Sequence, residues 1–222
     1  GECVNLMKIS LQEFAYNKCQ ELIGSGKLAP GQLYSEVAIS KQLGISRTPL
    51  RTALQQLEKE GLIIRLPQRG FYVYEFKEKD IEELFDIRKA IEGFAVEHIA
   101  KHNREIDLGQ AKKHLKAQED ARQSDDYSIF IREDRQFHEN LVNALKNKRL
   151  VTIYSDLRQS IELIGLKRFK MSSQRNQSIA EHKTILKAIE KGDPLAAREA
   201  VYNHLDMAMV SLKKYLKSID QI

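Results

Sequence analysis

Two short helical segments separated by a tight turn place the strongest constraint on how this chain can fold. Ser35 can cap a helix that ends at Gly44, and Ser46 can cap a second helix that ends at Gly61. Pro49 falls in the first turn of the second helix, where a missing N–H is tolerated. This spacing predicts a helix-turn-helix.

Further elements are expected on both sides of this pair. A helix precedes it and begins at Ser10, which forms a capping box with Glu13. Residues 62–65 (LIIR) and 71–74 (FYVY) follow it and are typical of two short strands, which the tip LPQRG joins as a hairpin. The order of these elements predicts a winged helix-turn-helix domain over residues 1–75.

The helix that follows Ser46 separates an apolar face from a polar one. Its apolar stripe comprises Leu50, Ala53, Leu54 and Leu57. The outward side chains are Thr48, Arg51, Thr52 and Gln55, with Arg47 at the edge near the helix start. Such side chains reach guanine, adenine or phosphate groups in a DNA major groove. The alternative is a solvated polar face on a small structural domain.

The hairpin tip offers a second contact with DNA. Arg69 suits the negative potential of a minor groove, and Gly70 allows a close approach of the two backbones. The formal net charge of +5 permits nucleic-acid binding without proving it, so the prediction rests on these motifs.

Two stretches carry a resemblance to a known family: APGQLYSEVAISKQLGISRTPLRTALQQLEKEGLI, residues 29–63, and RGFYV, residues 69–73. Both resemble the GntR family of bacterial transcription regulators, whose recognition helix is marked by SRTPLR followed by AL..LE.EGL. The resemblance implies DNA contacts by Ser46, Arg47, Thr48, Arg51 and Gly70. Val37 stands where many relatives carry an Arg or another polar residue that touches phosphate, which implies one backbone contact fewer and weaker affinity.

The remaining residues, 76–222, have long helical patterns with little Gly or Pro. Six helical segments are expected, near residues 78–102, 107–123, 127–146, 148–168, 178–191 and 194–217. Ser178 and Glu181 form a capping box, and Asp193–Pro194 opens the last helix. The predicted fold class is therefore mainly α: a winged helix-turn-helix followed by an antiparallel all-helical bundle.

Polar residues interrupt the apolar stripes of three of these helices. Asp134 and His138 lie four residues apart, on the same helical face as Phe137. His182 and His204 lie on the apolar stripes of two later helices. Each His taken singly is best explained as a hydrogen-bonded core residue. Together, one carboxylate and three imidazoles predict a site for a divalent cation, which would compensate the buried Asp134. Zinc, nickel and manganese all suit this donor set.

Arg88 and Glu92 interrupt another apolar stripe. Arg88 is a candidate for bidentate pairing with the carboxylate of a small effector. An internal salt bridge between Arg88 and Glu92 is the equally favoured alternative. The polar segment 171–178 (MSSQRNQS) is expected to be a loop that helps to cover the pocket. The remaining histidines are assigned to surface positions near helix ends: His98, His102 and His114.

Three stretches extend the resemblance to the FCD effector domain of the FadR-type branch of the GntR family: residues 81–100, 134–141 and 181–205. In many members an Asp and three His bind a metal below an effector pocket, and the matching positions are Asp134, His138, His182 and His204. The resemblance implies a small carboxylic acid as the effector. Six helical segments favour the shorter subtype of this domain.

These features predict a homodimeric transcription regulator that reads an inverted repeat on double-stranded DNA. A regulator that senses the metal directly is one alternative, and a metal-dependent enzyme is another. The chain has two cysteines, Cys3 and Cys19, and no apolar run of membrane-spanning length, which favours a cytoplasmic protein. The metal, the acid, the operator and the choice between repressor and activator stay open.

Overall fold

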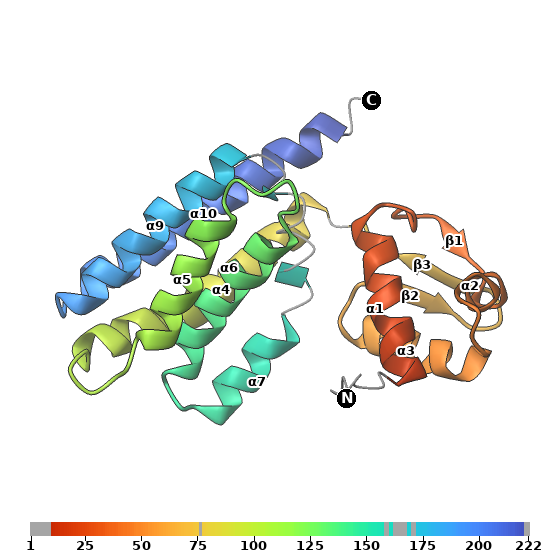
Figure 1. Ribbon diagram of the computed structural model, residues 1–222, viewed down its shortest axis with the longest axis horizontal. Coiled ribbons are helices and arrows are strands. Elements are labelled where there is room, and N and C mark those ends of the chain that lie inside the picture. The colour runs from red at the N-terminus through yellow and green to blue at the C-terminus, as the bar shows by residue number, and fades with distance from the viewer. Residues whose placement is uncertain (1–9, 76, 158–159, 162–167, 170–171, 220–222) are drawn as a thin grey trace, which may run out of the picture. The chain divides into compact units, whose positions relative to one another are not determined.

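The computed structural model describes residues 10–75, 77–157, 160–161, 168–169 and 172–219. The chain divides into two compact units, Gly1–Glu75 and Phe76–Ile222 (Figure 1). Helices dominate both units, and the small sheet belongs to the first, which confirms the predicted fold class. Within the described ranges, no helix combines the length and the apolar character that crossing a membrane requires.

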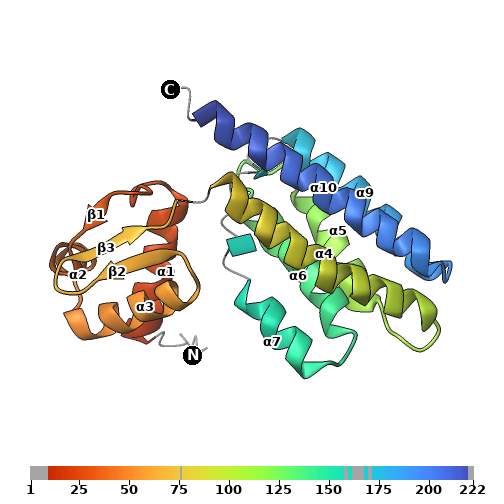
Figure 2. The same cartoon turned by 180° about the vertical axis from the view of Figure 1, so that it is seen from behind.

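The first unit packs three helices against a small antiparallel sheet. Its elements are α1 (Leu11–Gly24), β1 (Leu33–Tyr34), α2 (Glu36–Leu43), α3 (Arg47–Lys59), β2 (Ile63–Leu66) and β3 (Gly70–Val73). The strand order is β1-β3-β2, so β3 lies in the middle of the sheet (Figure 2). Both neighbours pair with it in the antiparallel sense. The wing is therefore formed as predicted, with β1 as an additional strand.

Local capping sets the bounds of the helices in this unit. The Ser10 hydroxyl accepts a hydrogen bond from the Glu13 N–H at 3.1 Å, which starts α1. Ser35 caps α2 in the same way, and Gly44 ends it in the left-handed conformation at φ 67°. Ser46 takes the N-cap position of α3 but makes no side-chain capping hydrogen bond, contrary to the prediction.

The second unit is a bundle of helices around one apolar core. Its described helices are α4 (Glu78–Lys101), α5 (Gly109–Ala121), α6 (Ser128–Asn143), α7 (Lys148–Asp156), α9 (Ser172–Glu190) and α10 (Pro194–Ile219). Helix α10 runs beside α4 and α9, while α5 packs on α6 (Figures 1 and 2). Fully buried aromatic side chains, including Phe85, Phe130 and Phe137, fill the space between them.

Helix α9 begins earlier than the sequence predicted. It starts at Ser172, so the expected loop over residues 171–178 is helical from Ser172 onward, and Met171 lies outside the described residues. Ser178 is not an N-cap: it is buried within the helix and donates a hydrogen bond to Asp134 Oδ1 at 3.1 Å. The Ser-x-x-Glu pattern misled the prediction because no helix breaker precedes it.

The segment before α9 also differs from its predicted form. Helix α7 ends at Asp156, whereas one continuous helix was expected over residues 148–168. Much of the stretch from 158 to 171 lies outside the described residues. The shorter-subtype assignment depends on this stretch and stays a prediction.

Candidate functional site

Helix α3 presents the polar face that the sequence predicted. Its apolar stripe, Leu50, Ala53, Leu54 and Leu57, is fully buried. The expected DNA-contacting residues on the opposite side are exposed: Ser46, Arg47, Thr48, Arg51 and Gln55. Thr52 is half-buried, and its hydroxyl donates to the Thr48 carbonyl at 3.2 Å. The amphipathic pattern therefore correctly separated core from surface.

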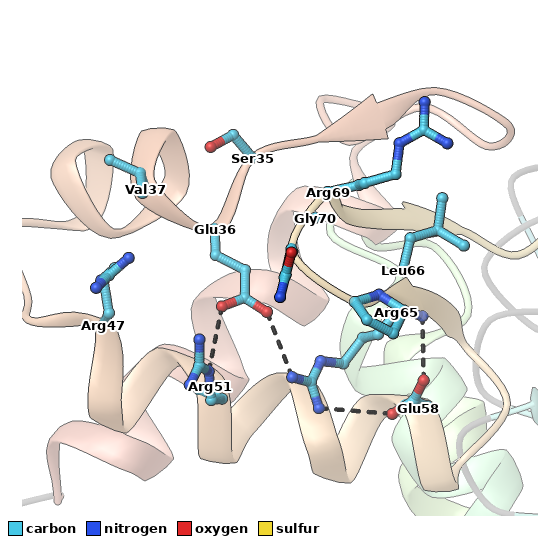
Figure 3. Close-up of a pocket in the computed structure, with 12 residues that line it drawn as sticks. Ser35, Glu36, Val37, Arg47, Arg51, Glu58, Arg65, Leu66, Arg69 and Gly70 are labelled. Atoms are coloured by element: carbon cyan, nitrogen blue, oxygen red, sulfur yellow. Dashed lines mark hydrogen bonds and ion pairs between the residues drawn. The ribbon is translucent and has the colours of Figure 1, made fainter.

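A hollow of about 340 Å³ lies between α2, α3 and the wing (Figure 3). Four arginines line it: Arg47, Arg51, Arg65 and Arg69. Val37 lines the same hollow and is 55% exposed. An uncharged side chain therefore stands where many relatives carry a phosphate-contacting residue, and the loss of that contact stays a prediction. The excess of positive charge in a concave face suits the phosphate backbone of DNA.

Two glutamates form ion pairs with two of the arginines in this hollow. The Glu36 carboxylate accepts from Arg51 Nε and from Arg65 Nη2, each at 3.4 Å (Figure 3). Glu58 accepts the backbone N–H of Arg65 at 3.1 Å and pairs with its guanidinium. The wing strand is thus fastened to α2 and α3. The roles of Glu36 and Arg65 could not be predicted from the sequence, because their contacts join residues that are far apart in the chain.

Gly70 has a structural role at the wing tip. Its φ is 123°, and a Cβ atom there would collide with the carbonyl oxygen of Tyr34 on the neighbouring strand. The adjacent Arg69 is exposed. The absence of a side chain at Gly70 is therefore required by the sheet itself, and Arg69 is free to reach outward.

In the second unit, three histidines from three helices meet in the core. His138 of α6, His182 of α9 and His204 of α10 are each at most 1% exposed. The Nε2 atom of His138 lies 3.2 Å from Nε2 of His182 and 3.2 Å from Nε2 of His204. Two nitrogens bound to one metal at about 2.0–2.1 Å would lie roughly 3.0–3.4 Å apart, so these separations fit a shared ion.

The opposite ring nitrogens of two of these histidines have their own partners. Nδ1 of His182 lies 2.9 Å from Oε1 of Gln118, and Nδ1 of His204 lies 2.7 Å from Oε2 of Glu181. Each partner is an acceptor, which assigns the proton to Nδ1 and leaves a lone pair on Nε2. Metal-bound histidines are commonly held in this way.

His138 is held by a buried carboxylate. Its Nδ1 lies 2.7 Å from Oε2 of Glu92, although neither atom has an aligned hydrogen-bond partner within the described residues. Oε1 of Glu92 accepts from Arg88 Nε at 2.7 Å and from the Tyr154 hydroxyl at 2.8 Å. Burial alone would raise the pKa of Glu92, but Arg88 and then His138 outweigh it and lower the pKa to about 2.

Unprotonated imidazoles are the form that binds metals, and the core favours this form. Burial lowers the pKa of His182 and His204 well below the usual range, and neighbouring positive groups lower it further. The Nε2 lone pairs of His182 and His204 would then both face Nε2 of His138, each at 3.2 Å. A cation at the point where these nitrogens converge would accept their lone pairs.

Asp134 is close to the three histidines but is not part of their cluster. Its Oδ1 lies 3.7 Å from Nε2 of His182 and accepts from Ser178. Among the described residues, the group whose donor atoms all lie within 4.8 Å of one another consists of His138, His182 and His204. The three histidines thus meet as expected, while Asp134 stays a predicted fourth ligand at one edge.

Arg88 and the histidines outside the cluster match their predicted roles only in part. Arg88 forms the internal ion pair with Glu92, the alternative that the sequence left open, and its contact with an effector stays a prediction. His114 is not a surface residue near a helix end: it is half-buried within α5, and its Nδ1 lies 2.6 Å from Oε2 of Glu133. His98 and His102 lie near the end of α4, as expected, with His102 exposed.

Acidification is expected to destabilise the metal-free protein. Because His182 and His204 have lowered pKa values, the unfolded chain binds more protons than the folded one below about pH 6.5. Stability is therefore intact above that pH and falls below it by up to about 1.4 kcal/mol per pH unit for each His. Glu181, whose pKa burial raises, opposes part of the loss.

We expect urea unfolding of the metal-free protein to show that the free energy of unfolding falls by about 2 kcal/mol between pH 7.5 and 5.5. In a His182→Gln/His204→Gln variant the free energy of unfolding should fall much less over the same interval. A His98→Gln variant, altered at a position outside the cluster, should keep the wild-type slope. Equal slopes in all three proteins would contradict the assignment of neutral core imidazoles.

Comparison with known protein families supports both halves of this description. Residues 11–73 match the bacterial regulatory proteins of the gntR family, and residues 83–207 match the FCD domain. The uncharacterized HTH-type transcriptional regulator YdhC of Bacillus subtilis (strain 168) is 29% identical over 204 residues, which cover 91% of each chain. The probable D-xylose utilization operon transcriptional repressor of Paenarthrobacter nicotinovorans is 30% identical over 184 residues, 82% of this chain and 80% of that one.

Solved structures share the fold at lower identity. A transcriptional regulator GntR from Rhodococcus sp. RHA1 aligns with a TM-score of 0.76 and 21% identity, covering 90% of this chain and 96% of that chain. The metal-free FCD domain of the regulator TM0439 aligns with a TM-score of 0.56 and 22% identity, covering 65% of this chain and 99% of that one. The family matches confirm the resemblance that the sequence motifs carried.

Proposed function

Because the chain belongs to the GntR family of bacterial regulatory proteins and carries an FCD domain, we propose that it is a metal-dependent repressor that responds to a small carboxylic acid. The family and the relatives are transcriptional regulators rather than enzymes. Repression is proposed because related proteins are named as repressors of sugar-acid and sugar operons. A cytoplasmic location would follow from access to the chromosome.

The DNA-binding part of the proposal rests on the arginine-lined hollow. Arg47 and Arg51 would reach the major groove from α3, while Arg69 would reach the minor groove from the wing. One winged domain reads one half-site, so an inverted repeat calls for two copies related by a twofold axis. Ile87 and Phe94 lie seven residues apart on one exposed face of α4 and are candidates for the contact between the copies.

The convergence of three Nε2 atoms is the observation that carries the metal proposal. His138, His182 and His204 would hold a divalent ion such as zinc, nickel or manganese, with Asp134 as a further ligand. The bound metal would supply a Lewis-acidic centre for an effector carboxylate. Glu92, Gln118 and Glu181 would keep the imidazoles oriented toward it.

Replacing Arg51 by Ala is expected to weaken operator binding by about 10- to 100-fold, because it removes a base or phosphate contact worth roughly 1–3 kcal/mol. The operator would first be selected from random DNA, and affinities would be measured by fluorescence anisotropy at several salt concentrations. Lys59→Ala removes a positive charge from the exposed end of the same helix and serves as the matched control. Selection that yields no inverted repeat, or equal losses in both variants, would contradict the proposal.

A regulator that responds to the metal alone is the second candidate. The complete burial of the three histidines favours it, because filling such a site could order the bundle without any acid. A titration of operator binding against zinc or manganese in the absence of acids separates the two. A full response to metal alone supports direct metal sensing, whereas a response that also requires an acid supports the main proposal.

A further inference from the structure

Glu36 lies between two arginines of the arginine-lined hollow in the first unit (Figure 3). One oxygen of its carboxylate, Oε2, lies 3.4 Å from Nε of Arg51 on α3, and the other, Oε1, lies 3.4 Å from Nη2 of Arg65 on β2. The Glu36 side chain is 16% exposed. A single carboxylate at the start of α2 thus joins α3 to the wing.

The Glu36 carboxylate is held in place from the side of the wing. Arg65 is itself fixed by Glu58, because its backbone N–H donates to Glu58 Oε1 at 3.1 Å and its Nη1 lies 3.6 Å from Glu58 Oε2. The Arg65 side chain is 21% exposed, compared with 56% for Arg51. The ion pairs therefore lead from a fixed, partly buried arginine through Glu36 to an exposed one.

The contact with Glu36 leaves the outer edge of the Arg51 guanidinium for DNA. Arg51 meets Glu36 through its inner nitrogen, Nε. Two parallel N–H bonds from the edge formed by Nη1 and Nη2 match the O6 and N7 acceptors of a guanine in the major groove. Holding a long, flexible side chain in one orientation before DNA binds also reduces the entropy that binding would otherwise cost.

A purely structural role explains the Glu36–Arg51 pair less well. An ion pair with a side chain as exposed as that of Arg51 stabilises a fold very little. The carboxylate also opposes DNA binding in general, because it places a negative charge among groups that would face the phosphate backbone. A group that weakens non-specific binding while it orients a base-reading arginine raises the selectivity of binding.

We propose that Glu36 is a positioning residue that makes Arg51 selective for guanine and disfavours binding to other sequences. Glu36 touches no base in this account and acts through Arg51. This inference rests on the proposed function, in which Arg51 reaches the major groove. The four arginines and two glutamates that line the hollow would then serve discrimination among sequences as well as affinity.

The test uses the full chain, an operator selected from random DNA and a scrambled duplex of the same length. The base pair that Arg51 reads is defined as the one whose substitution no longer affects binding in Arg51→Ala. In Glu36→Gln we expect about fivefold tighter binding to the scrambled duplex, and a log–log salt dependence steeper by up to about one. Discrimination at the base pair that Arg51 reads should fall by about tenfold.

Glu58→Gln is the matched control. It removes the same charge from the same hollow, but within the described residues its ion-pair partner is Arg65, not Arg51. Binding to the scrambled duplex should tighten in this variant too, whereas discrimination at the base pair that Arg51 reads should stay as in wild type. In an Arg51→Ala background, Glu36→Gln should leave that discrimination unchanged, because its effect passes through Arg51.

A structural role for Glu36 would give a different pattern. Glu36→Gln would then melt several degrees below wild type and bind both duplexes more weakly, with its base preference intact. Our account instead predicts a melting temperature within about 2 °C of wild type. Unchanged discrimination in Glu36→Gln overturns the inference, whatever happens to the overall affinity.

The remaining outcomes separate this inference from the proposed function. An Arg51→Ala variant with the base preference of wild type would show that Arg51 reads no base. That result overturns the inference and leaves the proposed regulator intact. A selection that yields no preferred sequence contradicts the proposed function and this inference together.

Discussion

Replacing Glu92 by Leu should lower the free energy of unfolding by about 3–5 kcal/mol. Glu92 is fully buried, and its carboxylate compensates the buried charge of Arg88 while it also accepts from the Tyr154 hydroxyl. Its loss leaves a cation in the core without a counter-charge and a phenol without an acceptor. Urea unfolding of the metal-free protein at pH 7.5 measures this loss.

The double variant Arg88→Met/Glu92→Leu is the informative control. Removing both charges eliminates the uncompensated cation, so a large part of the stability should return. It should not return fully, since Tyr154 and Nδ1 of His138 still lose their partner. A double variant as unstable as Glu92→Leu would show that the ion pair contributes little, and the polar core would then depend mainly on the hydroxyl and imidazole contacts.

The substitution Gly70→Ala is expected to lower the free energy of unfolding of the first unit by about 3 kcal/mol or more. The substitution places a Cβ atom against the Tyr34 carbonyl at a backbone conformation, φ 123°, that is unfavourable for residues other than Gly. Strand β1 must then separate from β3, with which Tyr34 pairs. Thermal unfolding followed by circular dichroism measures the loss.

Gly26→Ala is the matched control for this effect. Gly26 also has a positive φ, 76°, but no atom lies within 4 Å of its added Cβ, so only the conformational cost of about 1–2 kcal/mol applies. Equal losses of unfolding free energy in the two variants would show that β1 can move away from the added Cβ atom without a further loss of stability. Gly70 would then be needed for DNA contact rather than for the sheet.

The parts of the fold that the sequence predicts are those fixed by local patterns. The stripe of Leu50, Ala53, Leu54 and Leu57 and the capping residues Ser10 and Ser35 act within a few residues of the chain, and all have the predicted place. Strand β1 was missed because two residues carry no periodicity, and pairing with β3 alone defines it.

In the candidate site, too, the sequence reveals the local pattern but not the contacts that form when the helices pack. The i, i+4 pair of Asp134 and His138 is visible in the sequence, yet Asp134 turns out to lie beside His182 rather than within the cluster. The partners of the imidazoles come from elsewhere in the chain: Gln118 from α5 and Glu92 from α4. Nothing in their sequence neighbourhoods indicates these contacts, because they exist only after the helices have packed.

The metal content of the purified protein tests the central claim most directly. Wild type and a His182→Ala/His204→Ala variant would be dialysed against trace-metal-free buffer and examined by elemental analysis, with circular dichroism to verify the fold of both. Three converging Nε2 atoms predict about one equivalent of a transition metal in wild type and none in the variant. Wild-type protein that holds no metal, even after addition of zinc or manganese, would contradict the claim and leave the histidines as a hydrogen-bonded core.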